Sequence, residues 1–209
     1  MKETPEEEES ALEEVKYVLH DVSFLFPDKI HIIQLPKALE KKALANKIIK
    51  DKGDVAEAIR HYTLAISLCP PEETKEKAYM HNNLGMALKK LDKSLEAKGE
   101  FTKAIDLCPD YPKPLYHRMN IYKEETEYDM ALADANKILE IDPDFDKPYL
   151  KRDIIPKLEM LQKEKFEKMK EEVVGNLKNV GNKVLGYFGM SVDNFKMQQN
   201  PDGTYNINY

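Results

Sequence analysis

From Pro36 onward, apolar and polar residues alternate along the chain with a helical period. Apolar side chains recur every three or four positions, which is typical of helices that bury one face. The pattern breaks at Gly53-Asp54, at Leu91-Asp92 and near Thr126, and these breaks separate paired stretches. It therefore predicts helices over residues 37–50, 55–68, 73–90, 94–107, 112–124 and 128–141.

One short phrase closes every second predicted helix. It occupies residues 64–70, 103–109 and 137–143, and its final prolines lie 39 and then 34 residues apart. Proline stops each unit because it lacks an N–H and restricts the residue before it. A period of this length indicates stacked supersecondary units that are each too small to bury an apolar face alone. Such arrays usually present a surface to a partner.

The flanks of this array differ from it. Residues 1–36 combine an acidic tail with an apolar arm, which we expect to be a short helix and an extended segment packed on the repeats. Residues 144–190 contain a long predicted helix over about 157–185. Residues 191–209 surround Asn200-Pro201-Asp202-Gly203, a good turn sequence, and predict a small β-hairpin.

The long helix near the C-terminus has two interpretations. Its apolar residues form one stripe of Phe166, Met169, Val173, Leu177 and Val180. A solenoid needs a terminal cap, and this is the simpler interpretation. The alternative is a helix that docks into a partner or onto a membrane surface. Mixed Lys and Glu on its polar face disfavour the membrane.

Composition narrows the classes of function. The chain has 209 residues, 42% hydrophobic and 33% charged, with a formal net charge of −6. Residues 1–14 hold seven Glu and one Lys, so this tail accounts for the whole imbalance. The balanced remainder argues against general nucleic-acid binding. The sequence shows no secretory signal and no apolar run of about 20 residues, so we expect a cytoplasmic protein without a membrane span.

No residue pattern predicts catalysis, a cofactor or a metal site. The histidines lack paired metal spacing, the glycines form no phosphate loop, and no Ser or Cys has a recognisable catalytic partner. Cys69 and Cys108 occupy equivalent places in two repeats, where they most simply fill gaps between helices. We therefore expect a protein that is not an enzyme, with no catalytic residues, cofactor or bound metal.

The pattern of small and aromatic positions resembles the tetratricopeptide repeat. In residues 75–109 the matching positions are Leu84, Gly85, Leu88, Ala97, Phe101, Ala104 and Pro109. Residues 37–70 and 110–143 follow the same pattern with departures, such as Ala45 in place of the usual Gly. The tail from Lys170 is also similar to the C-terminal tail of one member of this family. The resemblance implies an all-α, three-repeat superhelix with a C-terminal capping helix and a small C-terminal β-hairpin.

A further resemblance concerns the concave face, which the first helices of such repeats line. Five residues occupy the positions of the carboxylate clamp of co-chaperones: Lys42, Asn46, Asn83, Lys113 and His117. That clamp holds the C-terminal Glu-Glu-Val-Asp peptide of the seventy- and ninety-kilodalton heat-shock chaperones. Its fifth residue is usually Arg, whereas here it is His117, which is largely neutral at pH 7 and offers fewer donors. Arg118 is adjacent in sequence and should point elsewhere.

The clamp chemistry is simple. Lysines supply point charges and asparagine amides supply oriented donors, so a terminal Asp with two carboxylates would receive charge-assisted hydrogen bonds. The leading prediction is therefore an adaptor or co-chaperone. One alternative is an adaptor for small or heterotrimeric GTPases that does not use the clamp. Another is a structural scaffold whose groove is masked by its own arm or tail.

Overall fold

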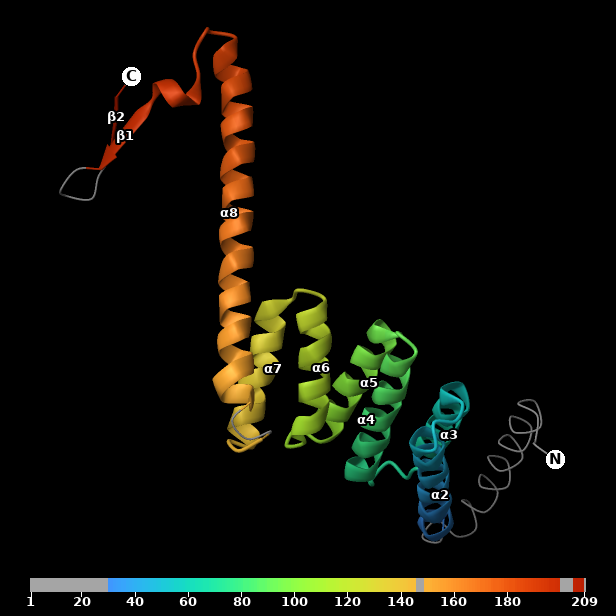
Figure 1. Ribbon diagram of the computed structural model, residues 1–209. Coiled ribbons are helices and arrows are strands. Elements are labelled where there is room, and N and C mark those ends of the chain that lie inside the picture. The colour runs from blue at the N-terminus through green and yellow to red at the C-terminus, as the bar shows by residue number, and fades with distance from the viewer. Residues whose placement is uncertain (1–29, 146–148, 200–204, 209) are drawn as a thin grey trace. The chain divides into compact units, whose positions relative to one another are not determined.

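The computed structural model describes residues 30–145, 149–199 and 205–208. It forms two compact units, which meet in sequence at Ile155 and Pro156. In the first unit, helices stack in antiparallel pairs (Figure 1). The pairs are α2 (Ile30–Lys50) with α3 (Val55–Leu68), α4 (Thr74–Lys90) with α5 (Ser94–Leu107), and α6 (Pro112–Glu124) with α7 (Tyr128–Ile141). The predicted all-α repeat architecture is thus confirmed.

The turns inside the three pairs share one backbone solution. Lys52, Asp92 and Thr126 each have a positive φ, between 56° and 61°. The next residue of each turn donates its N–H to a carbonyl five residues back, for example Gly53 to Ile48 at 2.8 Å. This left-handed residue with a closing hydrogen bond satisfies carbonyls that the helix end leaves free. The equivalent turns explain why the three pairs have similar geometry.

Small residues let the helices approach closely. Ala58, Ala97 and Ala131 are fully buried at equivalent positions of α3, α5 and α7. In the second repeat the packing leaves no room for a side chain at Gly85, because a Cβ there would lie 2.6 Å from Cε1 of Phe101. Phe101 is itself buried, so its ring fills the space that glycine leaves.

One sequence prediction for this unit was wrong. We expected residues 30–36 to be part of an extended arm, but α2 begins at Ile30 and contains Pro36. Proline inside a helix removes a hydrogen bond, which usually ends the helix. Here Leu35 and Leu39 pack against the buried cluster around Ala38, so burial on both sides of the proline supports a continuous helix. The acidic tail and the rest of the arm, residues 1–29, lie outside the described residues.

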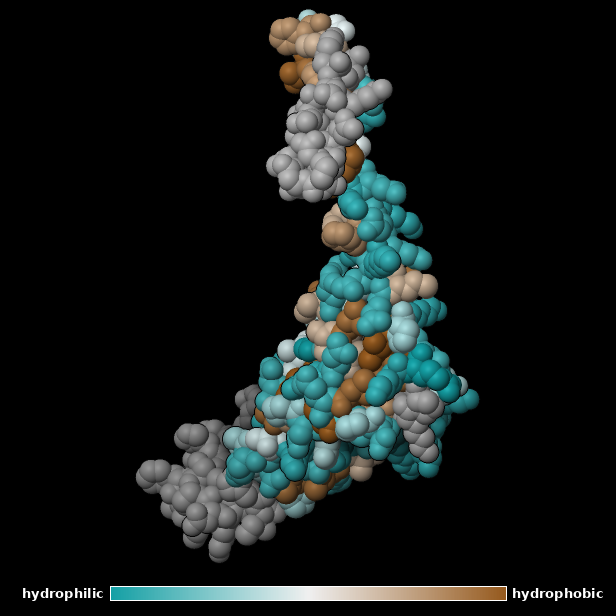
Figure 2. Space-filling model, turned by 90° about the vertical axis from the view of Figure 1, so that its left-hand side faces the viewer, coloured by the Kyte–Doolittle hydropathy of each residue, from teal (hydrophilic) through white to brown (hydrophobic). Residues whose placement is uncertain are grey.

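The second unit contains α8 (Ile155–Gly186), which follows a short π-helical segment, η2 (Leu150–Ile154). Several apolar side chains of α8 are exposed among charged ones (Figure 2), including Phe166, Met169, Val173, Leu177 and Val180. No helix in the described ranges combines the length and the apolar character that crossing a bilayer requires.

After α8 the chain folds back within the second unit. The Asn182 side chain accepts hydrogen bonds from Ser191 Oγ at 2.9 Å and from the N–H of Val192 at 2.6 Å. Val192 belongs to a short 3-10 helix, η3 (Val192–Asn194), and lies so close to Gly181 that a Cβ there would be 2.7 Å from it. Strands β1 (Lys196–Gln199) and β2 (Tyr205–Asn208) then pair antiparallel, with Met197 opposite Ile207.

Candidate functional site

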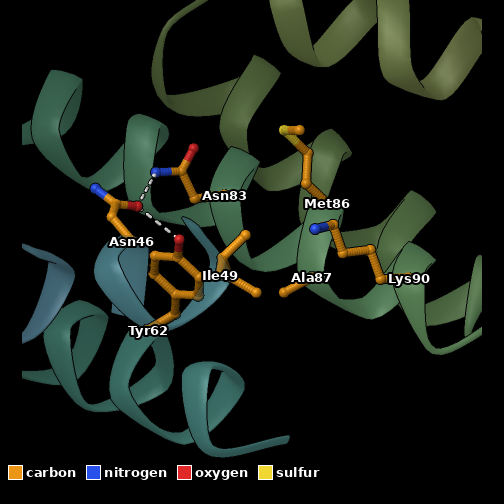
Figure 3. A pocket seen from close by; sticks show the side chains of 7 residues that line it. All are labelled: Asn46, Ile49, Tyr62, Asn83, Met86, Ala87 and Lys90. Carbon is orange, nitrogen blue, oxygen red and sulfur yellow. Dashed lines mark hydrogen bonds between the residues drawn. The ribbon is translucent and has the colours of Figure 1, made fainter. Parts of the chain in front are cut away.

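Three of the five predicted clamp residues lie together between α2 and α4. Asn46 of α2 and Asn83 of α4 are joined by a hydrogen bond of 3.1 Å, from Asn83 Nδ2 to Asn46 Oδ1. The same Asn46 oxygen accepts a 2.6 Å hydrogen bond from the hydroxyl of Tyr62 in α3 (Figure 3). Two donors therefore fix this oxygen, and the Asn46 amide N–H groups have no acceptor among the described residues. They remain available to an incoming acceptor.

Lys42 lies one helical turn before Asn46 on the same face of α2. Its ammonium is not free, because Nζ lies 2.5 Å from Glu76 Oε2 in the first turn of α4. Both side chains are partly buried. Glu76 is not among the residues predicted from the sequence. Glu76 precedes Asn83 by seven residues, which is two helical turns, so both lie on the same face of α4. This spacing is the sequence signal that could have identified Glu76.

A pocket of about 200 Å³ adjoins the two asparagines (Figure 3). Its floor is apolar, and its opposite end carries the exposed Lys90. It is lined by Asn46, Ile49, Tyr62, Asn83, Met86, Ala87 and Lys90. A small apolar pocket with amide donors at one end can take an aliphatic side chain while the neighbouring backbone or carboxylate meets the amides.

The remaining two predicted residues lie on α6. Lys113 is exposed and forms no ion pair with any other residue that the structure describes. His117, one turn further along, stacks on Phe101 with ring centroids 5.3 Å apart and an interplanar angle of 27°. Burial, and secondarily the charge of Lys113, lower the pKa of His117 from its ordinary value of 6.5. The imidazole is therefore neutral at pH 7.

The two groups of clamp residues are linked indirectly. Helices α4 and α6 are in contact. The buried ring of Phe101 lies against Gly85 of α4 and stacks with His117 of α6. Among the described residues, no side-chain hydrogen bond or ion pair joins Lys113 or His117 to Lys42, Asn46 or Asn83. The predicted clamp residues thus form two groups, Lys42, Asn46 and Asn83 on α2 and α4, and Lys113 and His117 on α6.

As predicted, Arg118 points away from the clamp residues. Its guanidinium donates to both carboxylate oxygens of Asp134, at 2.9 Å and 2.7 Å, and to Thr102 Oγ1 at 3.0 Å. Asp134 belongs to α7 and Thr102 to α5. Hydrogen bonding to Asp134 raises the pKa of Arg118, although burial opposes it. Arg118 therefore links the second repeat to the third through hydrogen bonds.

His81 and the two cysteines, which lie outside the clamp positions, take part in packing between helices. His81 Nδ1 contacts Glu100 Oε2 at 2.6 Å, between α4 and α5. Burial raises the pKa of the Cys69 and Cys108 thiols, which makes both poor nucleophiles. Within the described ranges, no cluster of three or more His, Cys, Asp or Glu side chains could hold a metal ion.

Comparison with known sequences supports the interpretation of the repeats. Residues 78–111 match the family model of the tetratricopeptide repeat. The mitochondrial import receptor subunit TOM70 of the rat is 32% identical over 111 residues, which are 53% of this chain and 18% of the relative. Mouse sperm-associated antigen 1 is 33% identical over 114 residues, 51% of this chain and 12% of the relative. The chain thus spans less than a fifth of the length of these relatives.

Solved structures share the fold. The first tetratricopeptide repeat domain of human RPAP3 superimposes with a TM-score of 0.53 at 21% identity, covering 64% of this chain and 98% of that one. The first such domain of Spaghetti, bound to the HSP90 peptide SRMEEVD, gives 0.52 at 23% identity, with coverages of 60% and 92%. The narrower resemblance of the tail, to tetratricopeptide repeat protein 1, stays a prediction. Residues 78–111 thus match the tetratricopeptide repeat family, and the helix pairs from α2 to α7 have the fold of such domains.

Proposed function

We propose that the protein is an adaptor that binds the free C-terminus of a peptide of the Glu-Glu-Val-Asp type, as carried by the seventy- and ninety-kilodalton heat-shock chaperones. The observation that carries the proposal is the Asn46–Asn83 pair. Its hydrogen bonds orient the Asn46 amide and leave its N–H groups to a ligand. The Spaghetti domain of the same fold is bound to an HSP90 peptide, which supports the choice of ligand.

Each residue has a distinct part in this proposal. The Asn46 and Asn83 amides receive the terminal carboxylate, and Lys113 supplies a positive charge that has no ion-pair partner in the described part of the chain. The pocket beside the asparagines takes the apolar side chain that precedes the terminal residue. Lys42 stays paired with Glu76 and adds no free charge. His117 contributes a neutral ring and no charge, because its pKa is lowered by burial.

The proposal is tested by reversing the charge of Lys113. In Lys113→Glu, we expect affinity for a fluorescent peptide ending in Met-Glu-Glu-Val-Asp to fall at least about tenfold, because a charge-assisted hydrogen bond contributes ~1.5–3 kcal/mol. The matched control is Lys168→Glu, which makes the same charge change on an exposed residue of α8. Equal binding by Lys113→Glu and the wild type, with unchanged circular dichroism, would refute the clamp. Binding of a folded GTPase that survives this change would favour the other adaptor role.

A further inference from the structure

Glu76 places a carboxylate of the protein itself on a clamp lysine. Its Oε2 lies 2.5 Å from Lys42 Nζ, and the two side chains are only 31% and 20% exposed. Partial burial limits the screening of this ion pair by salt. A ligand carboxylate that approaches Lys42 therefore meets an ammonium that is already neutralised.

The pair is built into the packing of the two helices. Lys42 and Asn46 lie on one face of α2, and Glu76 and Asn83 lie on one face of α4. Two polar links thus join the helices, one between Lys42 and Glu76 and one between Asn46 and Asn83. Lys42 is held by its ion pair with Glu76 of α4. It therefore cannot turn toward a ligand without breaking that pair.

The charges at the five clamp positions follow from these contacts. Lys42 is balanced by Glu76, and His117 is stacked on Phe101 and neutral. Lys113 is the remaining cation of the set, and it has no ion-pair partner among the described residues. A terminal Asp carries two carboxylates, so one of them would find no matching charge among these five positions. A terminal residue with a neutral side chain carries one carboxylate, which Lys113 and the amides can satisfy.

We infer that Glu76 sets the ligand specificity of this site, so that it binds a single C-terminal carboxylate and distinguishes little between a terminal Asp and a terminal residue with a neutral side chain. The inference rests on the proposed function and specifies which chain ends the site accepts. Glu76 competes with the second carboxylate of the ligand for Lys42, and the groove accepts a broader range of chain ends than one ending in Asp. The opposite role, in which Glu76 orients Lys42 for the ligand, predicts the opposite change on mutation.

The test compares three peptides that differ in the last residue or in its terminal carboxyl group. They end in Met-Glu-Glu-Val-Asp, in Met-Glu-Glu-Val-Asn, and in amidated Met-Glu-Glu-Val-Asp. Each is titrated by fluorescence anisotropy against the full-length wild type, Glu76→Gln and Glu159→Gln. Glu159 is an exposed residue of α8, so Glu159→Gln makes the same charge change outside the first unit. Circular dichroism and thermal unfolding check that each variant is folded.

For the wild type we expect the dissociation constants of the free Asp and Asn peptides to lie within about fivefold of each other. An exposed side-chain charge of the ligand contributes no more than this to affinity. In Glu76→Gln, Lys42 is released, so the Asp peptide gains affinity and its preference over Asn rises to about tenfold or more. Glu159→Gln should match the wild type. A wild type that already prefers Asp about tenfold, or a Glu76→Gln variant that binds both peptides more weakly, would overturn the inference.

The failure of the proposed function gives a different result. If amidated and free peptides bind equally, or no variant binds any of them, the proposed function fails and the inference fails with it. If the wild type binds none but Glu76→Gln binds the free Asp peptide, Glu76 blocks the site completely, which contradicts both the proposed function of the wild type and the inferred specificity.

Discussion

The imidazole of His117 stacks on the buried ring of Phe101, with centroids 5.3 Å apart. This contact places His117 against α5. Burial is the main cause of its lowered pKa, and the charge of Lys113 adds to it. The residue that the clamp pattern expects to be an arginine is therefore part of the packing between the second and third repeats. It cannot replace the charge and the planar donors of a guanidinium.

Replacing this histidine should strengthen the site. In His117→Arg we expect affinity for the free Met-Glu-Glu-Val-Asp peptide to rise about tenfold, since a charge-assisted hydrogen bond contributes ~1.5–3 kcal/mol. The measurement is an anisotropy titration at pH 7.5. His117→Gln, which keeps a neutral polar side chain, is the control and should bind like the wild type. An arginine variant that binds no more tightly would show that position 117 does not reach the ligand.

Gly85 should not tolerate a methyl group. Alanine normally favours a helix over glycine by about 1 kcal/mol. At Gly85, however, the added Cβ would lie 2.6 Å from the buried ring of Phe101, so the ring or the helices must shift. We expect Gly85→Ala to lower the free energy of unfolding by about 1–3 kcal/mol, as overpacking does. Urea unfolding measures it.

Gly99 is the matched control for this prediction. It lies on α5, and a Cβ there would meet nothing within 4 Å. Gly99→Ala should therefore raise the free energy of unfolding by up to about 1 kcal/mol. A destabilised Gly99→Ala, or a stabilised Gly85→Ala, would contradict the packing described for the second repeat.

The Arg118–Asp134 pair should affect stability and leave peptide binding unchanged. Its two hydrogen bonds are largely buried, so removing one partner leaves an uncompensated charge. We expect Asp134→Ala to lower the free energy of unfolding by about 3 kcal/mol. The peptide affinity of the folded variant should equal that of the wild type, because Arg118 points away from the clamp residues. A large loss of affinity without a loss of stability would assign Arg118 to the site.

Stability should fall in acid partly through Glu100. Burial opposes ionisation of this carboxyl, but hydrogen bonds from His81 and Lys103 outweigh it and lower its pKa from 4.5. A lowered carboxyl pKa contributes stability that is present above the unfolded value of 4.5 and is lost as the pH falls through the folded value. Urea unfolding at pH 7, 5 and 4 should show a smaller acid loss for Glu100→Gln than for the wild type. Glu140→Gln, at an exposed ion pair, should behave like the wild type.

Local pattern was enough to predict the repeats. The helical period and the closing prolines located α3, α5 and α7, because small residues such as Ala58 and Ala97 recur where helices cross. The start of α2 was missed, since the cost of Pro36 is local whereas the packing of Leu35 depends on residues in α3 and α4. Part of the site could be predicted in the same way. Asn46 and Asn83 occupy equivalent positions of neighbouring repeats, which predicted that they lie near each other.

Tertiary contacts decided the rest of the site. Spacing cannot show that Glu76 reaches Lys42, because the pair depends on how far α4 is shifted along α2. It also cannot show that His117 stacks on Phe101, since this requires α6 to lie beside α5. Both contacts reduce the positive charge of the clamp positions, so their sequence alone overstates how strongly they would attract a carboxylate.

The central claim is that the groove recognises a free C-terminal carboxylate. The most direct measurement is a parallel titration of the wild-type protein with a fluorescent Met-Glu-Glu-Val-Asp peptide and with its C-terminally amidated form. We predict that the free peptide binds and that amidation weakens binding by about tenfold or more, because the Asn46 amide loses its charged acceptor. Equal affinity for the two forms would contradict the account.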